Sequence, residues 1–125
     1  MKLISAPKAP TPAGHYSQAV VHNGVVYVSG QLGINPQNPK APTGSIEEQT
    51  EQTLANVRAI LEAAGSGLDR VLQMTVLIAD MDLWGKVNEV YTRVMGAHRP
   101  ARAVVPVKDL HYGRLIEIQA VAALE

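Results

Sequence analysis

An Asn-Gly dipeptide near the start of the chain separates two short runs that are rich in residues favouring β-strands. Asn23 and Gly24 lie between residues 16–22 and 25–29. A two-residue hairpin turn requires positive φ at both central positions, and Asn-Gly adopts that conformation readily. The sequence therefore predicts an antiparallel hairpin, which means that a β-sheet forms part of the fold.

The remainder of the chain alternates between helical and strand periodicity. Ser45 and Glu48 form a capping-box pattern, and apolar residues then recur at helical spacing as far as Gly65. A second helical pattern runs from Asp82 to Gly96. Strands are expected at 71–79, 102–107 and 115–123. Prolines gather at 1–14, which is expected to be an irregular or edge segment, and at 32–44, which is expected to be a loop.

The order ββαβαββ predicts an α+β fold in which two helices pack on one face of a single mixed sheet. The 125 residues are expected to form one domain, residues 1–125. No stretch is apolar enough to span a membrane and there is no cysteine, so we expect a cytoplasmic protein without disulfides. Eleven basic residues balance eleven acidic ones, which argues against a dedicated nucleic-acid binder. The four histidines show no metal-ligand spacing.

Alternation within the last two strands assigns their side chains to two faces of the sheet. The even-numbered residues of 116–122 are apolar and are expected to meet the helices, which leaves Glu117 and Gln119 on the second face. Arg102 and Val104 are assigned to that second face as well. Such a mixture of polar and aliphatic side chains fits an oligomer interface that holds a site, and it also fits an ordinary half-exposed sheet. The residue pattern leaves both interpretations open.

Five short segments are spread along the chain in a characteristic order. They are Gly14-His15-Tyr16-Ser17-Gln18-Ala19, Ser29-Gly30-Gln31, Asn88-Glu89-Val90-Tyr91, Pro100-Ala101-Arg102 and Ile116-Glu117-Ile118-Gln119-Ala120. Together they resemble the reactive-intermediate deaminase (Rid) family, also called the YjgF family, over nearly the whole chain. The resemblance implies a chorismate-mutase-like fold and a homotrimer with sites between subunits. It also implies hydrolysis of enamines or imines, such as 2-aminoacrylate, to a 2-keto acid and ammonia without a cofactor or metal ion.

The resemblance implies roles for individual residues. Arg102 would hold the substrate carboxylate through two parallel hydrogen bonds, and Glu117 would position and activate water, so these two are the expected catalytic residues. The expected substrate-binding residues are Tyr16, Ser29, Gly30, Asn88 and Val104. Without the resemblance, Arg102 would be interpreted as an exposed surface arginine and Glu117 as a solvated charge.

Three positions depart from the pattern common in the family. His15 replaces a proline, Val104 replaces a cysteine but keeps the backbone N–H, and Gln119 replaces a second glutamate. The changes at His15 and Val104 bear on substrate preference more than on reaction class. Three other functions remain open: a non-catalytic module that binds small carboxylates, RNA cleavage or translation inhibition, and a chaperone-like surface role.

Overall fold

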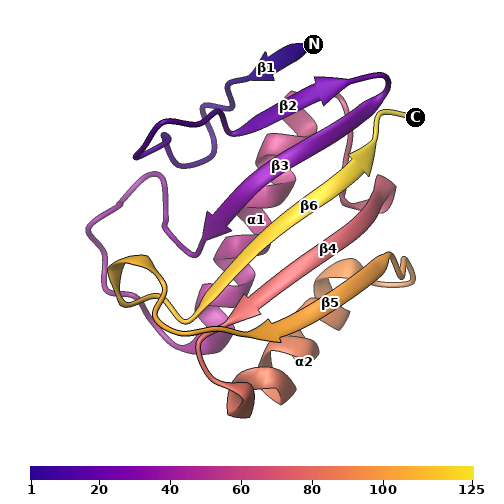
Figure 1. The fold of residues 1–125 in the computed structure, drawn as a ribbon. Coiled ribbons are helices and arrows are strands. Elements are labelled where there is room, and N and C mark those ends of the chain that lie inside the picture. Colours follow the sequence, from indigo (N-terminus) through magenta and orange to yellow (C-terminus); the bar gives the residue numbers. More distant parts are fainter.

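A computed structural model describes residues 1–125, and its centre is a single six-stranded sheet (Figure 1). The strands lie in the order β1-β2-β3-β6-β4-β5. All neighbours are antiparallel except β4 and β5, so the sheet is mixed, as predicted. The strands are β1 (Lys2–Ile4), β2 (Ala19–His22), β3 (Val25–Leu32), β4 (Val71–Ile78), β5 (Ala101–Pro106) and β6 (Ile116–Ala123).

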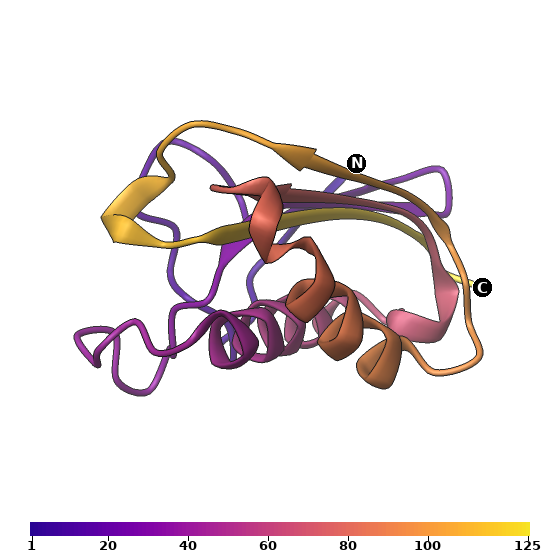
Figure 2. The ribbon, with the colours of Figure 1, turned by 90° about the horizontal axis from the view of Figure 1, so that it is seen from below.

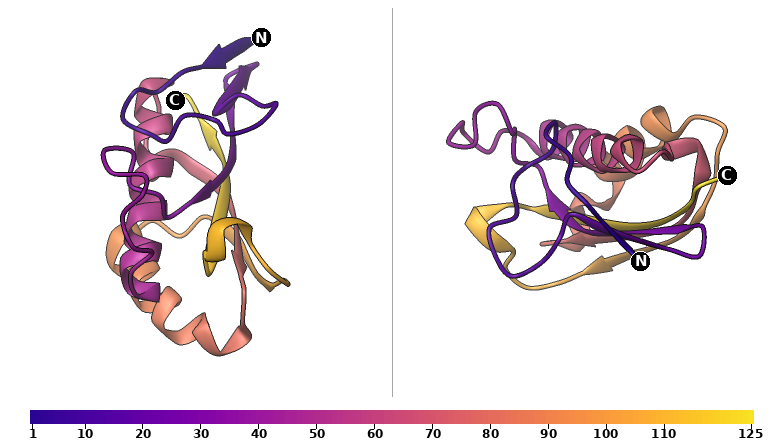
Figure 3. Two further views of the ribbon diagram at one scale, coloured as in Figure 1. Left: turned by 90° about the vertical axis from the view of Figure 1, so that its left-hand side faces the viewer. Right: turned by 90° about the horizontal axis from the view of Figure 1, so that it is seen from above.

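Two helices cover one face of this sheet. Figure 2 shows α1 (Ile46–Ala63) and α2 (Trp84–Met95) on the same side, and the side views of Figure 3 show no helix on the opposite face. Neither helix has the length and the apolar run that are needed to cross a membrane. Three short 3₁₀ turns lie in the connections: η1 (Leu68–Arg70), η2 (Met81–Leu83) and η3 (His111–Gly113).

The turn and the helix start that were predicted from local sequence are confirmed. Asn23 and Gly24 have φ values of 50° and 75° and join β2 to β3 in a two-residue hairpin. At the start of α1, Glu48 N donates to Ser45 Oγ and Ser45 N donates to Glu48 Oε1, both at 3.1 Å. Gly65 follows the end of α1 with a φ of 89°, as expected for a helix-terminating glycine.

The N-terminal segment is more ordered than predicted. It adds the edge strand β1, so the element order is βββαβαββ rather than ββαβαββ. Strand β2 begins only at Ala19, because Gln18 is buried and its Nε2 donates to Ala6 O at 3.1 Å and Pro10 O at 2.9 Å. The predicted start of this strand at residue 16 is therefore wrong, and Gln18 anchors the N-terminal segment.

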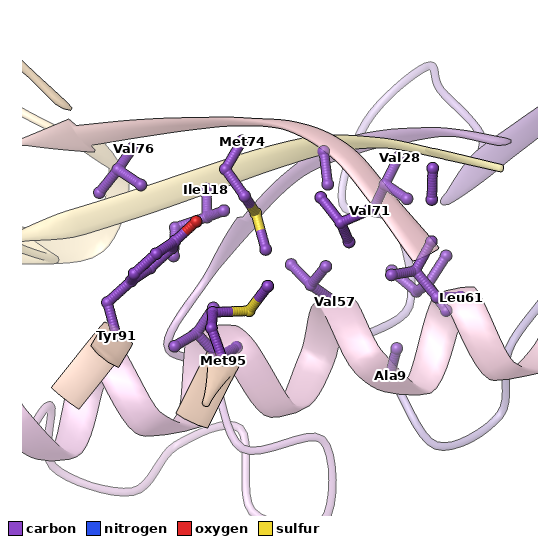
Figure 4. Packing of buried hydrophobic residues seen from close by; sticks show 14 of the residues in the cluster. Ala9, Val28, Val57, Leu61, Val71, Met74, Val76, Tyr91, Met95 and Ile118 are labelled. Carbon is purple, nitrogen blue, oxygen red and sulfur yellow. The ribbon is translucent and has the colours of Figure 1, made fainter. Parts of the chain in front are cut away.

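The core lies between α1 and the covered face of the sheet. Figure 4 shows Val57 and Leu61 of α1 beneath Val71 and Met74 of β4, and all four are almost completely buried. Burying an aliphatic side chain of this size contributes about 1.5–3 kcal/mol. This aliphatic packing holds β3, β6 and β4 in place, and the polar residues discussed below lie on these strands or at their ends.

Strand β6 follows the predicted alternation, but β5 does not. Glu117 lies between two fully buried isoleucines, as expected. In β5, however, Arg102 pairs with Met74 and Val104 pairs with Val76, and both of these β4 residues point into the core. Arg102 and Val104 therefore face the helices, and their assignment to the second face is wrong. Alternation is a poor guide here because β5 is an edge strand in which five of six residues are exposed.

The second face of the sheet is not covered by any part of this chain. Tyr27 is 50% exposed and Val105 is 40% exposed on this face. Leu77 and Val121 are half-buried beside them. The sheet thus presents an apolar surface next to the position of Glu117.

Candidate functional site

Four residues named from the sequence line one hollow at the end of the two central strands, β3 and β6. The hollow has a volume of about 320 Å³ and is lined by Tyr16, Ser29, Gly30 and Glu117. Its remaining lining residues are Ala13, Gly14, Leu32, His111 and Tyr112. These segments are distant in sequence and meet here because β3 pairs with β6. We call this space the Glu117 hollow.

A β-bulge in β3 places Ser29 and Gly30 at this hollow. Between Val28 and Gln31, β3 contains one residue more than the paired stretch of β6. Such bulges are frequent next to active sites, because the extra residue redirects a side chain and interrupts the ladder. The residue pattern predicted a regular strand here, and the bulge was not expected.

The carboxylate of Glu117 lies against the backbone of Gly30. A Cβ atom placed on Gly30 would be 2.1 Å from Glu117 Oε2, which is closer than two such atoms can approach. Glycine at position 30 therefore makes room for this carboxylate. Glu117 takes part in neither of the two ion pairs of the chain, so its charge is available to a ligand or a water molecule.

Ser29 and Tyr16 differ in their freedom to meet a ligand. Ser29 Oγ donates to Ser17 O at 2.6 Å, so this hydroxyl is oriented and offers its lone pairs to the hollow. Tyr16 is 50% exposed, and its hydroxyl accepts only a long hydrogen bond of 3.4 Å from Ala13 N. The Tyr16 side chain can therefore rotate to cover an occupant of the hollow, whereas the Ser29 hydroxyl is held in one orientation.

Arg102 and Asn88 form a second, separate polar group where β5 meets α2. Arg102 Nη1 donates to Asn88 Oδ1 at 2.8 Å, so Asn88 orients the arginine. The guanidinium carbon lies 4.8 Å from the centre of the Tyr91 ring. Arg102 borders a hollow of about 360 Å³ between this ring and the segment before β5. Its remaining N–H groups are free to bind a carboxylate.

Tyr91 supports Arg102 through its ring. Figure 4 shows its side chain rising from α2 toward the sheet. Burial raises the pKa of the Tyr91 hydroxyl, and the charge of Arg102 offsets part of that rise. The phenol therefore stays neutral, and its buried oxygen has no hydrogen-bond partner. The contact with the guanidinium is a cation–π interaction rather than an ion pair.

Arg102 and Glu117 are not brought together within one chain. Arg102 pairs with Met74 on the face covered by the helices, whereas Glu117 pairs with Leu77 on the uncovered face. The side chain of Val104 packs against the core and does not line the Glu117 hollow. The chain thus presents two polar groups, one around Glu117 and one around Arg102, at different places on its surface.

Two further residues line the Glu117 hollow and were not predicted from the sequence, His111 and Tyr112. They belong to η3, where Tyr112 and Gly113 have φ values of 60° and 66°. A Tyr-Gly pair before a strand is a turn signal, but no periodicity indicates where the side chains of a turn point. No group of three or more His, Asp or Glu side chains is placed to hold a metal ion.

The fold and these two polar groups define a class of small α+β protein. One face of its sheet is uncovered, and it carries two separate groups of potential ligand-binding residues, one around Glu117 and one around Arg102. The sequence model of the family described as Endoribonuclease L-PSP, which includes the Rid or YjgF proteins, matches residues 6–124. The chain belongs to this family, which confirms the resemblance found in the five sequence segments.

Individual relatives cover almost the entire chain. The 2-iminobutanoate/2-iminopropanoate deaminase of Rattus norvegicus is 43% identical over 121 residues, which is 97% of this chain and 88% of the rat protein. A putative endoribonuclease from Thermotoga maritima is 46% identical with a TM-score of 0.95, over 100% of this chain and 98% of that structure. The E. coli protein TdcF, solved with bound serine, is 34% identical with a TM-score of 0.93, over 98% of both chains.

Proposed function

We propose that this chain is an enamine/imine deaminase that hydrolyses reactive intermediates such as 2-aminoacrylate to a 2-keto acid and ammonia. The observation that carries the proposal is the Glu117 carboxylate, which lies against Gly30 in an open hollow beside Ser29 and Tyr16. A relative that is 43% identical over 97% of this chain is named for the same type of reaction.

The reaction requires water and a group that transfers protons. The enamine first becomes an imine when a proton is added at its terminal carbon and one is lost from nitrogen. Glu117 then accepts a proton from water as the oxygen attacks the imine carbon, and the nitrogen becomes protonated. The hydroxyl proton of this tetrahedral intermediate then passes to the amino nitrogen as the C–N bond breaks, which forms the C=O bond of the keto acid and releases ammonia. We assign the proton transfers of both steps to Glu117.

Arg102 is proposed to hold the substrate carboxylate from a neighbouring copy of the chain. Its guanidinium is oriented by Asn88 and retains free N–H groups, which suits two parallel hydrogen bonds to a carboxylate. Since Arg102 and Glu117 lie on opposite faces of one sheet, the β5 edge of one copy would have to face the Glu117 hollow of another. Val104 would contribute its backbone N–H at this edge, because its side chain is directed into the core.

We further propose that the assembly is a homotrimer. The number three comes from the family resemblance, and the uncovered sheet face supports the need for a neighbour. Tyr27 and Val105 are 50% and 40% exposed on that face. Since complete burial of a large apolar side chain contributes about 1.5–3 kcal/mol, burying the part of each that is still exposed would contribute about 1 kcal/mol. A ring with threefold symmetry would cover the same surface on every copy. The cytoplasmic location expected from the sequence remains a prediction.

A non-catalytic module that binds small carboxylates is the second candidate. The specific observation that favours it is the relative TdcF, which was solved with serine bound. Like the proposed substrate, serine carries a carboxylate and a nitrogen on the same carbon atom, but that carbon is not an imine carbon that water can attack. The residues proposed here would recognise both kinds of molecule, so only turnover separates the two candidates.

The deciding experiment generates 2-iminobutanoate in place from 2-aminobutanoate with an amino acid oxidase, in the presence of semicarbazide. Hydrolysis by this protein competes with trapping and lowers the early yield of semicarbazone, before the slower reaction of the keto acid with semicarbazide gives the same product. We expect the wild type to lower that yield and the Glu117→Gln variant to fail, while both bind 2-oxobutanoate. The matched control is Glu62→Gln, because Glu62 is exposed on α1.

The same experiment separates the alternatives. Binding of 2-oxobutanoate without any effect of the wild type on the semicarbazone yield would support the binding module. Cleavage of a labelled single-stranded RNA by the wild type would support the nuclease name that some relatives carry. We expect no cleavage, because eleven acidic residues cancel the eleven basic ones that would bind phosphates.

A further inference from the structure

Arg114 is a buried arginine without an acidic partner. The residue is 7% exposed, and its Nη1 donates to Gly33 O at 3.0 Å. Its buried Nε has no hydrogen-bond partner, and both ion pairs of the chain involve other arginines. An arginine keeps its positive charge at all ordinary pH values. A buried charge of this kind is costly unless an anion compensates it.

The nearby acid Glu48 does not compensate this charge. Glu48 and Arg114 both border a hollow of about 160 Å³ beneath the loop that follows β3. Glu48 Oε1 accepts a hydrogen bond from Ser45 N at 3.1 Å, and the hydrogen bonds of this capping box lower the pKa of Glu48. No ion pair forms between Glu48 and Arg114. Glu48 is thus engaged in starting α1.

On its other side, Arg114 lines a separate hollow of about 470 Å³. Its walls come from the N-terminal segment, the loop after β3 and η3, which lie at the same end of the strands in Figure 1. Arg114 is the only charged residue in this lining. The apolar part of the lining is mostly rigid proline: Pro7, Pro10, Pro36 and Pro39, together with Ile34 and Tyr112.

Tyr112 has an unusual backbone conformation at this hollow. Its φ and ψ are 60° and 29°, a left-handed conformation that bulky residues rarely adopt. Strained residues of this kind cluster at ligand clamps and active sites. The ring is 62% exposed and lines both this hollow and the Glu117 hollow. It is therefore placed to close over an occupant of the proline-lined space.

We propose that this hollow is a second ligand site, which binds a small organic carboxylate with an apolar body. The carboxylate would pair with the Arg114 guanidinium, and the apolar body would lie on the prolines and Tyr112. A phosphate ion alone would leave the apolar lining in water, and an uncharged hydrocarbon would leave Arg114 unpaired. The site uses neither Arg102 nor Glu117, so it does not depend on the proposed deaminase activity.

The test is a titration of the ¹⁵N-labelled protein with benzoate, followed by amide chemical shifts, with benzamide as the uncharged probe. We expect benzoate to shift the amide signals of Ala9, Gly33 and Ile34, which lie at this hollow and not at the Glu117 hollow, and benzamide to bind at least tenfold more weakly. Arg114→Met should weaken benzoate binding at least tenfold. Thr11→Trp should do the same by filling the hollow from its exposed rim, with Arg114 intact. The control Arg102→Met should leave these shifts unchanged.

Several results would overturn the proposal. The first is the absence of shifts at the three amides, and the second is equal binding of benzoate to the wild type and Thr11→Trp. The third is loss of the shifts in Arg102→Met while Arg114→Met retains them. A drop in molecular mass in Arg114→Met, with no benzoate binding by the wild type, would show that a neighbouring copy supplies the missing anion. If Arg114→Met does not fold, Thr11→Trp alone decides the question, because it leaves the buried arginine in place.

Discussion

Gly30 and Glu117 fit against each other so closely that a Cβ on residue 30 would be 2.1 Å from Glu117 Oε2 and 3.0 Å from Glu117 Cδ. The atoms in the way are the flexible end of a side chain rather than backbone, so Gly30→Ala should fold and displace the carboxylate. A displacement of about 1 Å in a reacting group can lower turnover about 100-fold. We expect a loss of that size in the semicarbazide competition assay, with a stability cost of about 1 kcal/mol in urea unfolding.

Gly85→Ala is the matched control for this substitution. A Cβ on Gly85, in α2, would meet nothing within 4 Å, and alanine favours a helix over glycine by up to about 1 kcal/mol. This variant should keep its activity and be slightly more stable. If Gly30→Ala retains full turnover, the position of the Glu117 carboxylate does not matter for the chemistry.

The sequence predicted those parts of the fold that depend on local chemistry. The Asn23-Gly24 hairpin and the capping box at Ser45 need only neighbouring residues to form, and both are present. The faces of β5 depend instead on what packs beside it, and Arg102 was assigned to the wrong face for that reason. The bulge at Ser29 and the short strand β1 were missed because both depend on a partner strand far away in the sequence.

The candidate site was likewise only partly predictable from the sequence. Tyr16, Ser29, Gly30 and Glu117 were named from the family resemblance, and the pairing of β3 with β6 places all four around one hollow. Arg102 lies apart from these four residues because it is on the face that the helices cover, whereas Glu117 is on the uncovered face. No pattern in the sequence indicated this difference. The burial of Arg114 could not be predicted from the sequence, because an arginine in a loop is normally exposed, whereas this one is 7% exposed.

The uncovered sheet face gives a prediction for assembly. Val105 is 40% exposed on this face, and Val105→Glu would place a carboxylate there. If a neighbouring copy covers the face, that carboxylate would have to lose its water, which costs free energy. We expect light scattering to show the mass falling from three times 13.4 kDa toward 13.4 kDa. The control is Arg58→Glu, which changes an exposed residue on α1. An unchanged mass in Val105→Glu would remove the proposed interface.

The capping box of α1 gives a prediction about acid stability. The backbone and side-chain hydrogen bonds with Ser45 lower the pKa of Glu48 from its usual value of 4.5. Because the pKa is lower in the folded state, this contribution to stability is complete above pH 4.5 and is lost as pH falls below it. The difference in unfolding free energy between the wild type and Glu48→Gln should therefore shrink between pH 5 and pH 3 in urea titrations. A difference that is independent of pH would mean that the charge of Glu48 does not stabilise the start of α1.

The separation of Arg102 and Glu117 within one chain gives the sharpest prediction about the proposed site. Arg102→Ala and Glu117→Gln should each be inactive in the competition assay when refolded alone. After the two variants are unfolded, mixed in equal amounts and refolded together, some sites should combine an intact Arg102 from one copy with an intact Glu117 from another. Random assortment puts both intact residues at about one quarter of the sites, so activity should return to about a quarter of the wild-type value. Mixing the folded variants without unfolding serves as the control and should restore nothing at first. Activity that stays at the level of the single variants after co-refolding would contradict a site shared between copies.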